Sequence, residues 1–209
     1  MYLSRIKLDA SRSQTMRAMV APNLMHGALE RCDDDRTRKL WRVDTLRGEP
    51  YLLVLSQKQI DFSAVAAQFG ECGGYETRCY DGLLQRIVNG STWHFRLKAN
   101  PVTHQKDPDG KRGRILAHIT PEHQAAWLRK QAEKHGFTLA DGEWLVSGSQ
   151  WYIFKKNRHE TKPVKLLAVT YEGILTVTDA EAFRAALVEG IGREKAFGLG
   201  MLTVTGGGR

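Results

Sequence analysis

The order in which strand-like and helix-like patterns follow one another is the feature that most limits the fold of this chain. An alternating segment at residues 2–8 is followed by a helical pattern that Pro22 divides into two helices. A proline inside a helix costs about 3 kcal/mol, whereas a proline in the first turn is tolerated. A hairpin pattern at 41–55, a helix at 61–69 and a strand at 75–80 follow. The order predicted for this part of the chain is therefore strand, helix, strand, strand, helix, strand.

The remainder of the chain repeats the same order. The expected elements are a strand at 92–98, a helix at 121–135, a broken strand over 143–147 and 151–155, an extended segment at 164–177, a helix at 180–188 and a strand at 199–204. Two β-α-β-β-α-β units in tandem predict an α+β protein made of two ferredoxin-like domains. We place the join within residues 81–91, which gives an N-terminal domain of 1–88 and a C-terminal domain of 89–209.

The composition argues against several other classes of protein. Among 209 residues there are three cysteines, an odd number without a CxxC pair, which argues against a disulfide framework and against a zinc site. The longest apolar run, at residues 51–55, is far shorter than the ~20 residues of a membrane helix. Charges at Arg5, Lys7 and Asp9 interrupt the first residues, so no secretory signal is expected. We therefore expect a cytoplasmic protein without a membrane partner.

The net charge of +8 is unevenly distributed along the sequence. Residues 151–165 carry five basic side chains and one acidic side chain, next to Trp151, Tyr152 and Phe154, and so hold half of the net charge. Residues 100–119 add four basic and two acidic side chains. Clustered basic charge beside aromatic side chains is typical of a polyanion partner such as nucleic acid, although a charge run is also compatible with an ordinary solvated face.

His26 is the first candidate for chemistry. Met25, Ala28 and Leu29 form an apolar stripe that should face the sheet, because these positions share one side of a helix. His26 then lies at the edge of the buried face, with Asn23 one turn earlier. An imidazole at this place could act as a general acid or base near neutral pH, while a purely structural, half-buried histidine would show the same pattern.

The strand at 92–98 has two chemically distinct faces. Because side chains alternate along a strand, Trp93, Phe95 and Leu97 share one face and the basic residues share the other. A loop rich in Lys and Arg follows. We predict phosphate contacts, against the alternative of a solvated sheet edge, from Arg96, Lys98, Lys111, Arg112 and Arg114.

A third candidate is the glycine-rich segment GIGREKAFGLG at residues 190–200. It lies between a helix and a strand, the reverse of a Rossmann or P-loop arrangement, and it has neither of their motifs, so no nucleotide cofactor is expected. Glycines would let such a loop follow a sugar-phosphate backbone, although a tight connection explains them equally well. The scattered histidines show no metal-ligand spacing, so no metal is expected. The residues assigned to nucleic-acid contact here are Gly192, Arg193, Gly198 and Gly200.

Four segments, taken together and in order, resemble one known family. They are MYLSRIKL at the start, APNLMHGAL around His26, FRLKANP with the GKR loop after it, and KAFGLGMLTV near the end. In these segments the chain resembles the CasE (Cse-type) family, which belongs to the RAMP superfamily of CRISPR-associated proteins. The resemblance covers nearly the whole chain. That family supplies the endoribonuclease subunit of the Cascade complex.

The resemblance implies a metal-independent cut in CRISPR repeat RNA at the 3′ base of its hairpin, without a cofactor. His26 is the position that matches the family's catalytic histidine. The 2′-OH upstream of the cut would be the nucleophile, which gives a 2′,3′-cyclic phosphate and a 5′-OH. The implied partners are the repeat RNA hairpin, the crRNA that is retained after cutting and the other Cascade subunits, with no direct contact to DNA.

One position departs from the family. Some members have a tyrosine one turn before the histidine, where this chain has Asn23, which neither gives nor takes a proton at neutral pH. Asn23 stays a candidate site residue, and Lys155 or Lys156 could stabilise the phosphorane instead. The same stretch is expected to form a basic hairpin against the RNA stem. Its predicted RNA contacts are Lys155, Lys156, Arg158 and Lys162.

Two other functions are compatible with the sequence. A non-catalytic RNA-binding or scaffolding protein of the same superfamily is favoured by Asn23. An RRM-type binder of single-stranded RNA would expose paired aromatic side chains on a sheet, whereas Trp93 and Phe95 have the pattern of core residues. We rank the endoribonuclease first and the single-strand binder last.

Overall fold

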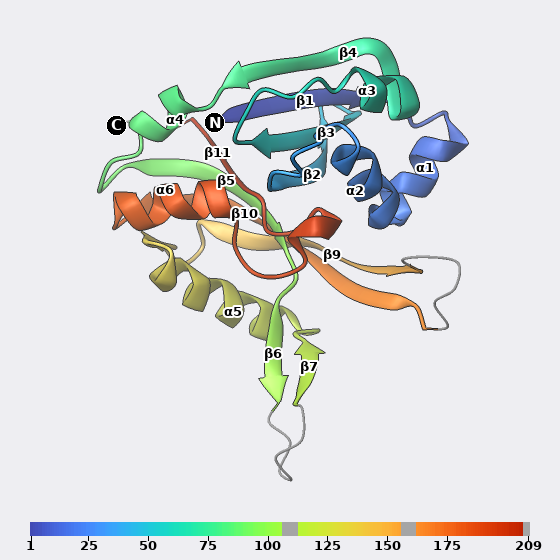
Figure 1. Ribbon diagram of the computed structural model, residues 1–209. Coiled ribbons are helices and arrows are strands. Elements are labelled where there is room, and N and C mark those ends of the chain that lie inside the picture. Colours follow the sequence, from blue (N-terminus) through green and yellow to red (C-terminus); the bar gives the residue numbers. More distant parts are fainter. Residues whose placement is uncertain (106–112, 156–161, 207–209) are drawn as a thin grey trace.

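The computed structural model describes residues 1–105, 113–155 and 162–206, and within these residues no helix is long and apolar enough to span a membrane. Figure 1 shows the elements as two units, one above the other. The first unit contains β1 (Tyr2–Leu8), α1 (Ser13–Val20), α2 (Pro22–Glu30), β2 (Lys39–Leu46), β3 (Glu49–Ser56), α3 (Ser63–Phe69) and β4 (Gly70–Cys79). After the short helix α4 (Asp81–Gln85), the second contains β5 (Thr92–Ala99), β6 (Val102–Gln105), β7 (Arg114–Ala117), α5 (Pro121–Lys134), β8 (Phe137–Thr138), β9 (Trp144–Phe154), β10 (Val164–Val177), α6 (Ala180–Glu189), the 3-10 helix η1 (Lys195–Phe197) and β11 (Leu202–Thr205).

The first sheet has the strand order β2-β3-β1-β4, and every neighbouring pair is antiparallel. The hairpin expected at 41–55 is present as β2 and β3. Its turn residues Arg47 and Gly48 have φ values of 53° and 84°, and positive φ at both central residues is what a two-residue type I′ turn requires. Helix α2 begins at Pro22, as predicted, because a proline in the first turn loses no intrahelical hydrogen bond.

The second sheet has the order β11-β5-β10-β8, and β9 also pairs with β10. In the first sheet β1 lies between β3 and β4, and in the second sheet β5 lies between β10 and β11. With β8 and β9 both paired to β10 in the place that β2 takes beside β3, the two units share one topology. The prediction of two ferredoxin-like units in an α+β protein is confirmed. The first sheet ends at Cys79 and the second begins at Thr92, so the boundary proposed at residue 88 falls between the two sheets.

The strand β4, the strand β9 and the segment after β5 differ from the elements expected from the sequence. β4 begins at Gly70, earlier than expected. The backbone of Gly70 lies so close to β1 that a Cβ at this position would overlap the carbonyl oxygen of Lys7, and glycine, which has no Cβ, avoids this overlap. β9 is one continuous strand across the expected break, with an irregular register beside Thr170. After β5, where a basic loop was expected, β6 and β7 form a hairpin, so Arg114 lies in a strand.

Each unit has its own apolar core between its sheet and its helices. In the first unit, Met25 and Leu29 of α2 pack against strand residues such as Ile6. In the second unit, Trp93 and Leu97 of β5 are buried with residues of α5 and α6, which confirms the predicted core face of this strand. Burial of the β5 aromatics also argues against an RRM-type surface, which requires exposed aromatic rings.

A buried arginine joins the two units. The side chain of Arg42, on β2, is 1% exposed and donates two hydrogen bonds to Asp44, at 2.7 and 2.6 Å. It also donates to the carbonyl oxygens of Arg96 at 2.9 Å and Met201 at 2.8 Å, and to the hydroxyl of Thr203 at 2.7 Å. A buried charge is tolerated only when it is paired and hydrogen-bonded. Since the partners come from both units, Arg42 fixes how the first sheet docks on the second.

Candidate active site

Helix α2 places His26 at the edge of its buried face, as the spacing of apolar residues predicted. Met25, Ala28 and Leu29 are buried in the core of the first unit, whereas the side chain of His26 is 37% exposed. A half-exposed imidazole is held by protein contacts on one side and is accessible to a ligand on the other. This is the placement that a proton-transferring residue needs.

Elements of both units meet around the imidazole of His26. The Phe197 ring of η1 packs edge-on against it, with ring centroids 6.3 Å apart, and Phe197 in turn packs against Phe154 at the end of β9, at 5.0 Å. From α2 itself, a carboxylate oxygen of Glu30 lies 4.0 Å from Nδ1 of the histidine. Glu30 is not among the site residues predicted from the sequence, although its i, i+4 spacing from His26 is a visible signal.

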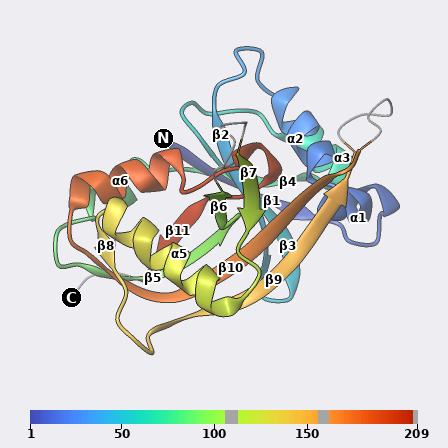
Figure 2. The same ribbon diagram turned by 90° about the horizontal axis from the view of Figure 1, so that it is seen from below.

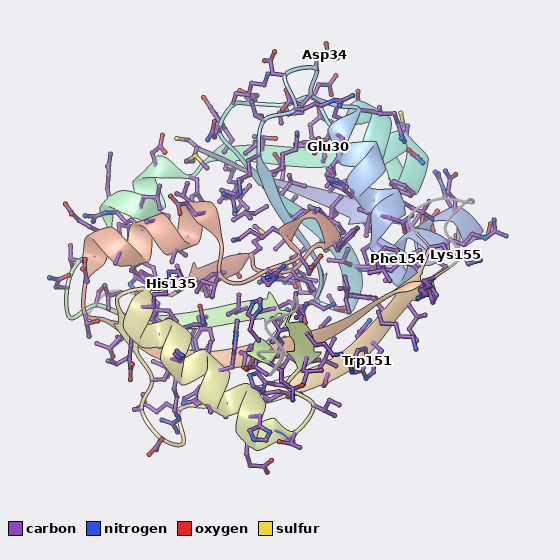
Figure 3. The ribbon with its side chains drawn as sticks, turned by 60° about the horizontal axis from the view of Figure 1, so that its bottom comes forward. Glu30, Asp34, His135, Trp151, Phe154 and Lys155 are labelled. Carbon is purple, nitrogen blue, oxygen red and sulfur yellow. The ribbon has the colours of Figure 1, made fainter. Side chains whose placement is uncertain are left out.

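Asn23 connects the same helix to the hairpin formed by β9 and β10. Its amide nitrogen donates to the backbone carbonyl of Lys155, at 3.2 Å. Its Oδ1 is buried and has no hydrogen-bond partner among the described residues. Figure 3 shows Phe154 and Lys155 beside α2, with Glu30 toward the other end of that helix. Asn23 therefore holds the positively charged end of the hairpin next to the helix that carries His26.

The β9–β10 hairpin is the candidate RNA-binding element of this site. The two strands pair up to Phe154 and Val164, and the hairpin extends toward α1 (Figure 2). Lys155 and Lys162 are exposed at its end. Lys156 and Arg158 lie outside the described residues, so the catalytic role of Lys156 and the RNA contacts of both residues stay predictions.

Arg96 and Lys98, on the face of β5 opposite the core, are engaged by protein groups. Arg96 pairs through Nε with Glu172 and lies 3.7 Å from Asp44 through Nη1. Lys98 donates to the hydroxyl of Tyr152 at 2.8 Å. Because the first unit docks against this face, Arg96 lines a groove of about 990 Å³ between the two sheets instead of an open edge. Direct RNA contact by Arg96 and Lys98 stays a prediction.

The glycine-rich segment packs tightly against aromatic rings and backbone. Gly198 has a φ of 74°, and a Cβ at this position would lie 2.6 Å from the ring of Trp41. A Cβ on Gly200 would lie 2.6 Å from a backbone carbonyl oxygen, and Gly192 lies against the ring of Trp127. These contacts explain the glycines by packing, which is the alternative that the sequence left open. Contact of this segment with RNA stays a prediction.

Two further predicted contacts lie at the β6–β7 hairpin. The guanidinium of Arg193 lies 3.4 Å from Nε2 of His104 on β6, and Arg114 is exposed on β7. Lys111 and Arg112 lie outside the described residues. The glycine-rich segment and the β6–β7 hairpin, far apart in the sequence, are therefore side by side. Within the described ranges, no group of three or more His, Cys, Asp and Glu side chains is arranged to hold a metal ion.

The fold and the site together define a tandem ferredoxin-like protein with a histidine beside a basic hairpin. The chain belongs to the CRISPR associated protein family, whose model matches residues 1–205. It is 31% identical to the CRISPR-associated endoribonuclease Cse3 of Thermus thermophilus, over 98% of this chain and 99% of that protein. It is 30% identical to the CRISPR system Cascade subunit CasE of Escherichia coli over 123 residues, 55% of this chain and 58% of that protein.

Solved structures show the same relationship. A structure of CRISPR endoribonuclease Cse3 bound to a 19-nt RNA has a TM-score of 0.80 and 28% sequence identity, and the match covers 99% of this chain and 100% of that one. Thermus thermophilus Cse3 bound to an RNA representing a pre-cleavage complex has a TM-score of 0.79 and 27% identity, covering 98% of each chain. The family resemblance seen in four sequence segments is confirmed.

Proposed function

We propose that this chain is a metal-independent endoribonuclease that cuts CRISPR repeat RNA at the 3′ base of its hairpin. It leaves a 2′,3′-cyclic phosphate and a 5′-OH, and it retains the crRNA for the Cascade complex in the cytoplasm. The observation that carries the proposal is the meeting of the His26 helix with the basic β9–β10 hairpin, joined through Asn23 and Lys155. A relative similar over nearly the full length is named an endoribonuclease, and a solved Cse3 structure contains RNA.

The reaction uses groups that the RNA itself provides. The 2′-oxygen upstream of the cut attacks the adjacent phosphorus as its proton is removed, and the 5′-oxygen of the next nucleotide leaves with the bonding electrons and takes up a proton. His26 supplies one of these two proton transfers, since an imidazole exchanges a proton near neutral pH. Lys155, exposed at the end of the β9–β10 hairpin, and Lys156, the next residue in the sequence, supply positive charge toward the phosphorane.

The direct test is incubation of the wild-type protein with a labelled repeat hairpin in excess EDTA. Cutting is expected to persist, because no step uses a metal ion, and the upstream product should end in a cyclic phosphate that resists alkaline phosphatase. A hairpin with a 2′-deoxynucleotide upstream of the cut should bind and stay intact. Cutting that stops in EDTA, or that continues on the 2′-deoxy hairpin, contradicts the mechanism.

A non-catalytic RNA-binding scaffold is the second candidate, because Asn23 stands where some family members have a tyrosine. Under this alternative the wild-type protein binds the hairpin and leaves it intact both with and without EDTA. The same incubation therefore separates the two functions, and the appearance of a cut product decides for the enzyme.

Phosphate contacts at the end of the β9–β10 hairpin should make RNA affinity depend on salt. Replacing Lys155 or Lys162 by alanine is expected to weaken binding and to reduce the slope of log K against log salt concentration by about 1 for each phosphate interaction removed. Arg78→Ala is the matched control, since the Arg78 side chain is 81% exposed on β4 and belongs to no proposed RNA contact. Filter binding from roughly 50 to 300 mM salt measures the slopes. Unchanged slopes in both lysine variants would place the RNA on another surface.

A further inference from the structure

Glu30 occupies a position that is electrostatically unfavourable for a carboxylate. It is the last residue of α2, and the last turn of this helix contains no basic residue. The C-terminal end of a helix carries partial negative charge, so an acidic side chain there is destabilising. The Glu30 side chain is only 33% exposed, so water relieves the repulsion only in part. An attractive interaction must offset this cost.

Two cationic or potentially cationic groups face the Glu30 carboxylate. Its Oε1 lies 4.0 Å from Nδ1 of His26 and 3.6 Å from Nζ of Lys39. Lys39, on β2, has a side chain that is 2% exposed, and its ammonium lies 3.0 Å from Asp33 and donates to the carbonyl of Thr37 at 2.8 Å. Lys39 is therefore paired at shorter range by Asp33. The ammonium of Lys39 is thus shared between two carboxylates, and it offsets the unfavourable position of the Glu30 carboxylate only in part.

A second ammonium group, that of Lys58, belongs to the same cluster of charges. Asp33 also faces the ammonium of Lys58, 2.8 Å from its other oxygen. Hydrogen bonds from Lys58 and from a neighbouring threonine hold the pKa of Asp33 well below its usual range, so this carboxyl is ionised. The cluster consists of the carboxylates Glu30, Asp33 and Asp35 and the ammonium groups of Lys39 and Lys58. Besides Lys39, the described group whose nitrogen lies within 4.0 Å of the Glu30 carboxylate is the imidazole of His26.

We propose that Glu30 is a positioning residue for His26, an inference that rests on the proposed function. Anchored by the buried ammonium of Lys39, its carboxylate faces Nδ1 and orients the imidazole, which leaves Nε2 as the nitrogen that exchanges a proton with the RNA. Its negative charge attracts the positive charge that the ring carries while it holds that proton, as the aspartate does in a Ser-His-Asp triad.

The distance between the two groups fits this role. Catalytic hydrogen bonds are often long in the absence of substrate and shorten when it binds, and both side chains lie on one face of α2 at an i, i+4 spacing. The edge-on packing of Phe197 restricts the ring from the side of the second unit. Glu30 and Phe197 together therefore limit the orientations that His26 can take.

Glu30→Gln tests the inference, because it removes the charge and keeps the size of the side chain. Single-turnover cleavage of the repeat hairpin is expected to slow by about tenfold or more, while the affinity for the uncleavable 2′-deoxy hairpin and the melting temperature stay near those of the wild type. Glu30→Asp, which keeps the charge on a shorter side chain, should cut at a rate between those of the wild type and Glu30→Gln. Glu76→Gln is the matched control, since Glu76 is an exposed, ion-paired glutamate on β4, and it should cut at the wild-type rate.

Other outcomes of these measurements contradict either the role of Glu30 or the proposed function. Wild-type cleavage together with an unchanged rate in Glu30→Gln overturns the inference and leaves the proposed function standing. A joint loss of affinity and melting temperature in Glu30→Gln also overturns it, because the residue would then be structural. Equal rates for the Gln and Asp variants overturn the role of the charge. Failure of the wild-type protein to cut the hairpin contradicts the proposed function itself.

Discussion

Replacement of His26 by alanine is expected to slow cleavage of the repeat hairpin by about a hundredfold or more, because one positioned acid or base contributes about 10²–10⁴ in rate. Affinity for the hairpin should stay within a few-fold of the wild type, since phosphate contacts dominate binding to nucleic acid. The fold should also persist, because the His26 side chain is 37% exposed and alanine is the best helix former. Single-turnover kinetics and binding of the 2′-deoxy hairpin measure the two quantities separately.

His123→Ala is the matched control for this substitution. His123 is exposed on α5, which lies on the opposite side of the second sheet from α2 (Figure 1). This variant should cut at the wild-type rate. A His26→Ala protein that cuts normally would remove the histidine from catalysis. A His26→Ala protein that no longer binds the hairpin would show that His26 is a structural residue.

Under the proposed mechanism, Asn23 leaves a larger share of the catalysis to His26. An amide cannot transfer a proton at neutral pH, so the phenol found at this position in some family members has no equivalent here. The structure gives Asn23 a different task, because its amide holds the backbone of Lys155 beside α2. With one proton-transferring side chain and a basic hairpin, the rate should be modest. A modest rate would be sufficient under the proposed function, in which each precursor is cut once and the product is retained.

The fold could be predicted from the sequence where local patterns decide the structure. Pro22 divides the first helical region, and the alternation of Trp93, Phe95 and Leu97 identifies the core face of β5. The β6–β7 hairpin was missed because each of its strands has four residues, too few for a clear alternating pattern. β9 runs through a polar segment that resembles a break, because pairing with β10 supplies its hydrogen bonds.

Of the candidate site, only the features that depend on a single helix could be predicted from the sequence. The edge position of His26 follows from helical spacing within α2, so sequence alone was enough. The contact of Asn23 with Lys155 spans 132 positions, and no local pattern indicates it. The sequence likewise predicts Arg96 on an open basic face. Its two carboxylate neighbours, Glu172 and Asp44, belong to different units and come together around it only when the units dock.

Replacement of Arg42 by methionine is expected to destabilise the protein by about 3–5 kcal/mol, the usual cost of removing one partner of a buried ion pair. Methionine fills much of the volume of the arginine side chain but donates no hydrogen bond. Asp44, which is 7% exposed at its side chain, would lose the guanidinium that pairs with it at two oxygens. The carbonyl oxygens of Arg96 and Met201 would each lose one donor as well. Urea unfolding measures the free energy.

Two further variants distinguish the destabilisation caused by a buried, unpaired charge from the destabilisation caused by a smaller side chain. Arg42→Met combined with Asp44→Leu should recover part of the lost stability, because no buried carboxylate is then left without its two-hydrogen-bond partner. Arg5→Met, which breaks an exposed ion pair with Glu76, should cost less than about 1 kcal/mol. Wild-type stability in Arg42→Met would show that other contacts hold the two units together.

Cleavage should fall in Arg42→Met even below the denaturation midpoint. His26 belongs to the first unit, whereas Phe197 and Lys155 belong to the second, so the site is complete only when the two units are docked. Looser docking is expected to lower the single-turnover rate more than the affinity, since the basic hairpin lies wholly within the second unit. Equal losses of rate and affinity would indicate that RNA binding itself requires contacts from both units.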